Sequence, residues 1–162
     1  MLTTSHTLVG EARIAALIRA YLAADYRWEL DGVWRNLRIG QPAPEVERWC
    51  PKAERFGLLS AWDPYSIPRT EDVNRAADEN LHRDLMLTGL SMRAAFSSAA
   101  NRSWREPSWL VAGMAMRDFD ALSWSYGQLA TLAWEQGRPV RLRVDAARPP
   151  GFDDHPWVDW LK

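Results

Sequence analysis

The sequence has only one cysteine, Cys50, so no disulfide can form within the chain, and a reducing compartment fits this composition. We expect Cys50 to be a packed thiol rather than a nucleophile. The chain also lacks an excess of either charge. Its formal net charge of -1 argues against general binding to a nucleic-acid backbone. The three histidines are far apart and lack metal-ligand spacing, so no metal site is predicted.

Long hydrophobic runs are also missing. The longest uncharged segment, residues 121–134, is too short to span a bilayer. Residues 6–26 are interrupted by Glu11, Arg13 and Arg19, which a signal-peptide core would not contain. Glycine motifs for dinucleotides or phosphates are absent, as is a Gly-x-Ser-x-Gly motif, so no cofactor is predicted. We therefore expect a cytoplasmic protein without a membrane segment.

Tryptophan, in contrast, is abundant, with ten residues in a chain of 162. We expect most of them in the core and its rim, and the alternative is a stacking platform for a ligand. A chain of this length is expected to form one domain with a core of its own.

The local patterns predict alternating helices and strands. The strongest of them is a hairpin in which Asp31-Gly32 joins two alternating runs, because this pair tolerates a primed two-residue turn. The expected order is helix, strand, strand, helix, strand, helix, strand, strand, helix, strand, with the first helix over about 7–24 and the last over about 118–136. We predict an α+β single domain, with a mixed, mostly antiparallel sheet and helices packed against it.

The C-terminal segment differs from the rest in composition. We assign residues 1–147 to the globular domain and 148–162 to an acidic, aromatic tail. The tail either remains a mobile appendage or docks on the domain through Trp157 and Trp160, and we favour docking because two exposed tryptophans are costly to leave in water.

The predicted helix from Thr70 to about Thr88 carries polar residues that fall within its apolar arc. On a wheel of about 100° per residue with Val73 at the origin, Asn80 lies near -20° and Asp84 near +20°. Inward-facing polar groups need partners. In a structural interpretation, Asn80 ties down the preceding turn through backbone bonds and Asp84 pairs with an arginine. In a functional interpretation, both line a polar pocket.

Two more polar residues draw attention. Gln128 lies in a predicted helix that is apolar nearly all round, so its amide needs partners as well. Glu106 precedes a predicted strand and lies between Trp104 and Trp109 in the sequence. A carboxyl group crowded by aromatic rings can have a raised pKa, as a general acid or base requires, although pairing with a neighbouring arginine is the alternative.

Several segments resemble a bacterial family catalogued as domain of unknown function 3293. The matching segments are Tyr21 with Tyr26, "LRIG" at 37–40, "SAWDPYS" at 60–66, Asn80 with Arg83, "WREPSWLVAG" at 104–113 and "YGQLA" at 126–130. The resemblance covers about residues 20–145. The family pattern as we read it has Asn where this chain has Asp63, Thr where it has Ser60 and Phe where it has Tyr126. The resemblance implies a shared fold and residue set, and no named activity.

Three functions remain open. In the first, which we prefer, the protein binds a small polar or anionic ligand in a pocket between the turn at 61–66 and the following helix. Its ligand-binding residues would be Trp62, Ser66, Asn80, Arg83, Trp104 and Gln128. In the second, the same pocket is the active site of a small enzyme of hydrolase or lyase type, with Glu106 or Asp63 as acid or base. In the third, these polar residues have only a structural role, and the tryptophan-rich surface or the tail binds a protein partner. A metal-dependent nuclease would additionally need Asp63, Asp84 and Glu106 to converge.

Overall fold

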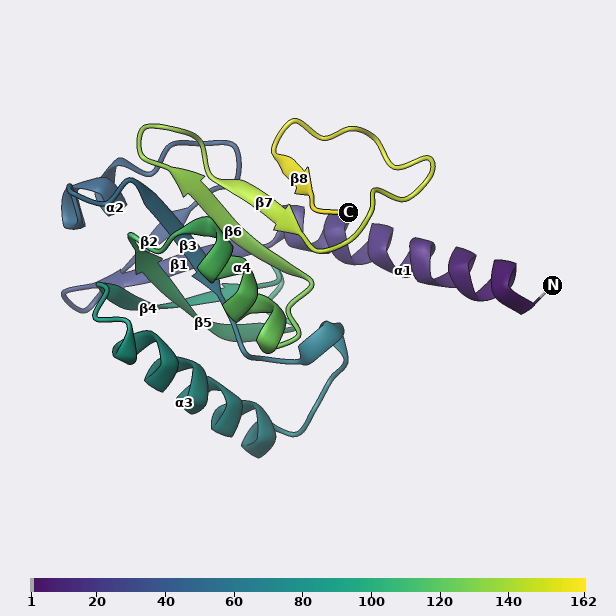
Figure 1. Ribbon diagram of the computed structural model, residues 1–162, viewed down its shortest axis with the longest axis horizontal. Coiled ribbons are helices and arrows are strands. Elements are labelled where there is room, and N and C mark those ends of the chain that lie inside the picture. The colour runs from purple at the N-terminus through teal and green to yellow at the C-terminus, as the bar shows by residue number, and fades with distance from the viewer. Residues whose placement is uncertain (1) are drawn as a thin grey trace.

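The computed structural model describes residues 2–162 and confirms an α+β fold with an eight-stranded sheet (Figure 1). The helices are α1 (Leu2–Ala23), α2 (Pro44–Trp49), α3 (Glu71–Leu87) and α4 (Met116–Ser125), with a short 3-10 turn, η1 (Pro64–Ser66). The strands are β1 (Asp25–Leu30), β2 (Val33–Leu37), β3 (Arg55–Leu59), β4 (Met92–Ser98), β5 (Arg105–Ala112), β6 (Ala130–Glu135), β7 (Arg141–Val144) and β8 (Val158–Trp160).

The sheet has the order β2-β1-β4-β5-β3-β6-β7-β8, and every pair of neighbours is antiparallel except β7 and β8. The sheet also curls. Ile39, just after β2, forms a parallel bridge with Val140, just before β7, although these strands are far apart in the sheet order. The curl gives the sheet an enclosed inner face.

Each face of the sheet carries its own apolar cluster, because side chains alternate along a strand. Leu58 belongs to the inner cluster, which includes Ile18 of α1 and Val46 of α2. Leu59 belongs to the outer cluster, which includes Leu81 of α3 and Phe119 of α4. Helices therefore cover both faces of the central strands.

The hairpin was predicted correctly. Asp31 and Gly32 have φ values of 53° and 77° and connect β1 to β2. The tail, residues 148–162, contributes β8 to the edge of the sheet, and its Trp160 packs edge-to-face against Phe152 at 5.4 Å.

The predicted helix over 118–136 is wrong in its second half. α4 ends at Ser125, Gly127 adopts a φ of 66°, and residues 130–135 form β6 between β3 and β7. A central strand buried on both faces has a continuous apolar sequence, which helical periodicity alone cannot distinguish from a buried helix. Pairing with two neighbouring strands decides the conformation here.

Close packing between β3 and α4 depends on Gly57. A Cβ atom at this position would overlap the Phe119 ring, lying 2.6 Å from its Cζ atom. We expect Gly57→Ala to lower the free energy of unfolding by about 2 kcal/mol, measured by urea denaturation. The matched control is Gly10→Ala in α1, where a Cβ atom meets nothing within 4 Å. This control should raise stability by about 0.5 kcal/mol, and equal effects of the two substitutions would refute the packing argument.

Candidate functional site

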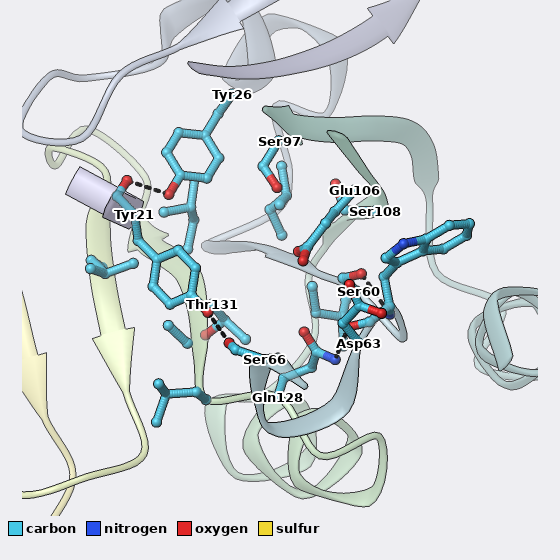
Figure 2. Close-up of a pocket in the computed structure, with 17 residues that line it drawn as sticks. Tyr21, Tyr26, Ser60, Asp63, Ser66, Ser97, Glu106, Ser108, Gln128 and Thr131 are labelled. Atoms are coloured by element: carbon cyan, nitrogen blue, oxygen red, sulfur yellow. Dashed lines mark hydrogen bonds between the residues drawn. The ribbon is translucent and has the colours of Figure 1, made fainter. Parts of the chain in front are cut away.

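A small cavity of about 40 Å³ lies at one end of the inner face of the sheet, beneath α1 and the turn that contains η1 (Figure 2). Segments from α1, β1, β3, β4, β5, β6 and β7 and from two loops contribute to its walls. Its polar lining residues are Tyr21, Tyr26, Ser60, Asp63, Ser66, Ser97, Glu106, Ser108, Gln128 and Thr131. At roughly 10–15 Å³ for each water molecule, the cavity has room for about three.

The floor of the cavity is set by strand register. Tyr26 of β1 pairs with Ser97 of β4, which pairs with Glu106 of β5, so the three side chains form a row across neighbouring strands. Ser108, two residues beyond Glu106, lies on the same face of β5. Its hydroxyl group is buried and has no hydrogen-bond partner in the described part of the chain.

Glu106 has the most perturbed carboxyl group at this site. Burial raises its pKa from the usual 4.5 to about 7, and the negative charge of Asp63 adds to the effect. Figure 2 shows its carboxyl group pointing into the cavity between Ser97 and Asp63. A pKa of about 7 lies in the range that acid–base chemistry near neutral pH needs.

Its aromatic neighbours in the sequence are not the cause of this shift. Trp104 precedes β5 and does not line the cavity. Trp109 lies on the outer face, where it stacks on His82 of α3 and donates a hydrogen bond to Asp78. The prediction that Trp104 lines the pocket is wrong, because Trp104 lies before β5 begins and is not among the lining residues. Trp109 is three residues from Glu106 and so lies on the opposite face of the strand.

The turn above the cavity has an unusual backbone. Asp63, Tyr65 and Ser66 all have positive φ values, of 42°, 57° and 57°. Such conformations cost non-glycine residues on the order of 1 kcal/mol each and persist only where surrounding contacts hold them. Here the Tyr65 amide donates to the Gly127 carbonyl, and Arg13 of α1 donates to the carbonyls of Tyr65 and Ser66.

Gly127 permits this arrangement, because a Cβ atom there would lie 2.8 Å from the Cβ atom of Pro64. The turn is thus the element that approaches Gly127 closely.

Asn74 fixes the turn to α3. Its side-chain oxygen accepts hydrogen bonds from the Asp63 amide and from Arg69 Nε, and its side-chain nitrogen donates to Asp63 Oδ1. Arg69 also donates from its backbone amide to Asp63 Oδ1 and from its guanidinium to the Ala61 carbonyl. Asn74 is 1% exposed, so it performs the structural role that the sequence interpretation assigned to Asn80.

The prediction that Asn80 and Asp84 face inward is wrong. Both are exposed, and the buried arc of α3 contains Asn74, Leu81 and Leu85. This arc is centred about 100° from Val73, which is itself 48% exposed. The Leu81–Leu85 pair, one turn apart, was the signal that would have placed the arc correctly.

Arg83 also lies outside the cavity. It donates to Asn80 at 3.3 Å on the exposed face of α3, and neither residue lines the site. Asp84 accepts a hydrogen bond from the Tyr126 hydroxyl at 2.5 Å and is likewise absent from the lining. Asp63, Asp84 and Glu106 therefore do not converge, and the described residues contain no group of three or more side chains suited to a metal ion.

The other predicted residues do come together. Trp62, Asp63, Ser66, Glu106 and Gln128 all line the cavity. Gln128 lies in the loop between α4 and β6, not on a helix, and its nitrogen donates to the carbonyls of Trp62 and Tyr126.

Sequence reasoning missed the role of several lining residues. Tyr21 hydrogen-bonds Ser66 at the cavity mouth, and Tyr26 donates to the Tyr21 carbonyl at 2.5 Å. Ser97 and Ser108 were also missed. Strand alternation was the available signal, because Ser108 is two residues from Glu106 and so lies on the same face of β5.

Among the described residues, no helix is both long enough and apolar enough to cross a membrane. Neither the comparison with curated proteins nor that with solved structures gives a match. A family described as "Protein of unknown function (DUF3293)" matches residues 59–131. This segment contains the turn, α3, Glu106 and Gln128, and it is shorter than the 20–145 range suggested by the motifs. The match over residues 59–131 supports the resemblance to this family that the motifs suggested.

Proposed function

We propose that the protein binds the polar end of a small molecule in the cavity above Glu106. The observation that carries this proposal is the convergence of hydrogen-bonding groups from distant segments on an open space, with one of them left without a partner among residues 2–162. Ser108 has a buried hydroxyl group without a partner, and burial without a compensating donor raises the pKa of Glu106. Unsatisfied buried polar groups cost about 1–3 kcal/mol each, and a bound ligand would recover part of that cost.

A purely structural role accounts for only part of the polar set. The Asp63–Asn74–Arg69 group is satisfied internally and holds the turn. Glu106 differs, because no hydrogen bond to its carboxyl group forms within residues 2–162 and burial raises its pKa. We therefore separate a structural network behind the turn from a binding surface beneath it.

The cavity size limits the ligand. A space for about three water molecules admits a terminal group of three or four non-hydrogen atoms, while the rest of a larger molecule would extend out of the mouth. At no more than about 1.5 kcal/mol for each atom, such a fragment binds no more tightly than a Kd of tens to hundreds of micromolar.

A second function, acid–base catalysis by Glu106, is favoured by one observation. A pKa of about 7 suits a group that both accepts and donates protons near neutrality. Asp63 fits this role less well, because its Oδ1 atom already accepts two hydrogen bonds. We place either function in the cytoplasm, since a chain with one cysteine suits a reducing compartment.

The binding proposal is tested with three fragments of matched size, acetamide, ethylammonium and acetate, titrated to tens of millimolar. We expect at least one to shift the NMR signals of the Gln128 side-chain amide and of the Glu106 backbone amide, with saturation. Ser108→Val should weaken that response at least fivefold by adding a methyl group to the cavity wall. The matched control, Ser91→Val at an exposed position, should leave it unchanged. No saturable shift with any fragment would refute the proposal.

A further inference from the structure

We infer that the group bound in this cavity is a small cation with N–H donors, such as the primary ammonium end of an amine. The inference rests on the proposed function and specifies its ligand class. It replaces the anionic alternative, because none of the lining residues is an arginine, lysine or histidine.

The cavity presents hydrogen-bond acceptors. The Gln128 nitrogen is occupied by two carbonyl groups, so its side-chain oxygen remains as an acceptor, and Figure 2 shows that oxygen on the side facing Glu106. The Ser60 hydroxyl group is already used twice, donating to the Pro107 carbonyl and accepting from the Trp62 amide. The Ser108 hydroxyl group can act as donor or acceptor, so the ligand's chemistry is decided by the other two free groups, the Glu106 carboxyl group and the Gln128 oxygen. Both require a donor.

The charges around the cavity also favour a cation. Asp63 is the charged residue that acts on Glu106, and both carry negative charge when ionised. Two arginines lie near the turn, but their guanidinium groups are bound elsewhere. Arg13 donates to the carbonyls of Tyr65 and Ser66, and Arg69 donates to Asn74 and the Ala61 carbonyl. An anion would thus enter a site without a cation to balance it, next to two carboxyl groups.

Binding of a cation should be linked to release of a proton from Glu106. The titratable groups facing it are Asp63 from the turn, Tyr21 from α1 and Tyr26 from β1. Burial raises the pKa of both tyrosines above 10, so they stay neutral between pH 5 and 9. The pKa of Glu106 is about 7, so the carboxyl group loses its negative charge as the pH falls below 7. Affinity for a cation should therefore increase with pH, by up to tenfold for each pH unit, until about pH 7, and stay constant above that.

The test compares ethylammonium with acetamide, acetate and tetramethylammonium by NMR titration between pH 5.5 and 8.5. At pH 8 we expect ethylammonium to bind at least tenfold more tightly than the other three fragments. At pH 5.5 we expect ethylammonium to bind at least tenfold more weakly than it does at pH 8. Tetramethylammonium controls for charge without N–H donors. Glu106→Gln should abolish both the preference for ethylammonium and its pH dependence. Glu79→Gln, at an exposed position on α3, should change neither.

The outcomes separate this inference from the proposed function. If acetamide shifts the NMR signals of Gln128 and Glu106 and ethylammonium does not, the cavity binds small polar groups but the assignment of a cation is wrong. Acetate binding as tightly as ethylammonium, or equal ethylammonium binding by the wild type and Glu106→Gln, also overturns the assignment. If no fragment binds, both proposals fail together.

Discussion

Asn74→Ala is expected to lower the free energy of unfolding by about 3 kcal/mol. The substitution removes the acceptor for the Asp63 amide and the donor for the Asp63 carboxylate in one step, and both groups remain partly buried. Hydrogen bonds to charged groups contribute about 1.5–3 kcal/mol each, and groups left without partners add to the loss. For a chain of this size, the melting temperature should fall by roughly 6–12 °C. Urea denaturation monitored by tryptophan fluorescence measures the free energy of unfolding and its dependence on urea concentration.

The same helix provides the control. Asn80→Ala removes an identical amide from an exposed position and should cost less than about 0.5 kcal/mol. A double-mutant cycle with Asp63→Ala should show a coupling energy above about 1 kcal/mol for Asn74 and near zero for Asn80. A larger effect of Asn80→Ala than of Asn74→Ala would contradict the assignment of Asn74 to the turn.

Glu106→Gln is expected to stabilise the protein, by about 2–3 kcal/mol at pH 8. The folded state raises the pKa of Glu106 from 4.5 to about 7, so it holds a proton that the unfolded chain releases. Between these two values the folded state binds more protons than the unfolded state, and stability therefore falls as pH rises. Above pH 7 the whole cost of a buried, ionised carboxylate is present, and an uncharged amide of the same shape removes it.

This prediction has a characteristic pH profile. The difference in unfolding free energy between variant and wild type should be small near pH 5, grow up to pH 7 and remain constant to pH 8.5. Glu79→Gln should give a difference below about 0.5 kcal/mol throughout. A profile for Glu106→Gln that is flat over this range would show that the carboxyl group is not held in the unfavourable environment described above. A stabilising substitution at a site of this kind is typical of positions where function opposes stability.

The fold was more predictable from the sequence than the site. The Asp31-Gly32 hairpin and the α2 segment depend on local chemistry, and both form as expected. β6 could not be recognised, because its conformation is set by pairing with strands far away in the sequence. Its apolar residues alone fit a helix equally well.

Among the candidate site residues, those that lie in the turn or in a family motif do line the cavity, as with Asp63, Ser66 and Gln128. Asn80 was chosen over Asn74 because Val73 was taken as the centre of the buried face, whereas α3 lies at the surface and leaves Val73 in solvent. Ser97 and Ser108 lie beside the cavity because β1, β4 and β5 pair in one particular register. Register of that kind follows from tertiary pairing, so a single sequence does not specify it.

The position of β3 bears on how the chain emerges from the ribosome. This strand precedes both of its neighbours, β5 and β6, in the sequence, so one edge stays unpaired until residue 112 has been synthesised and the other until residue 135. Within this strand, residues Phe56 to Leu59 carry no charge, and their unpaired backbone groups would meanwhile be open to pairing with other chains. Until β5 has been synthesised, this short segment has neither of its neighbouring strands to pair with.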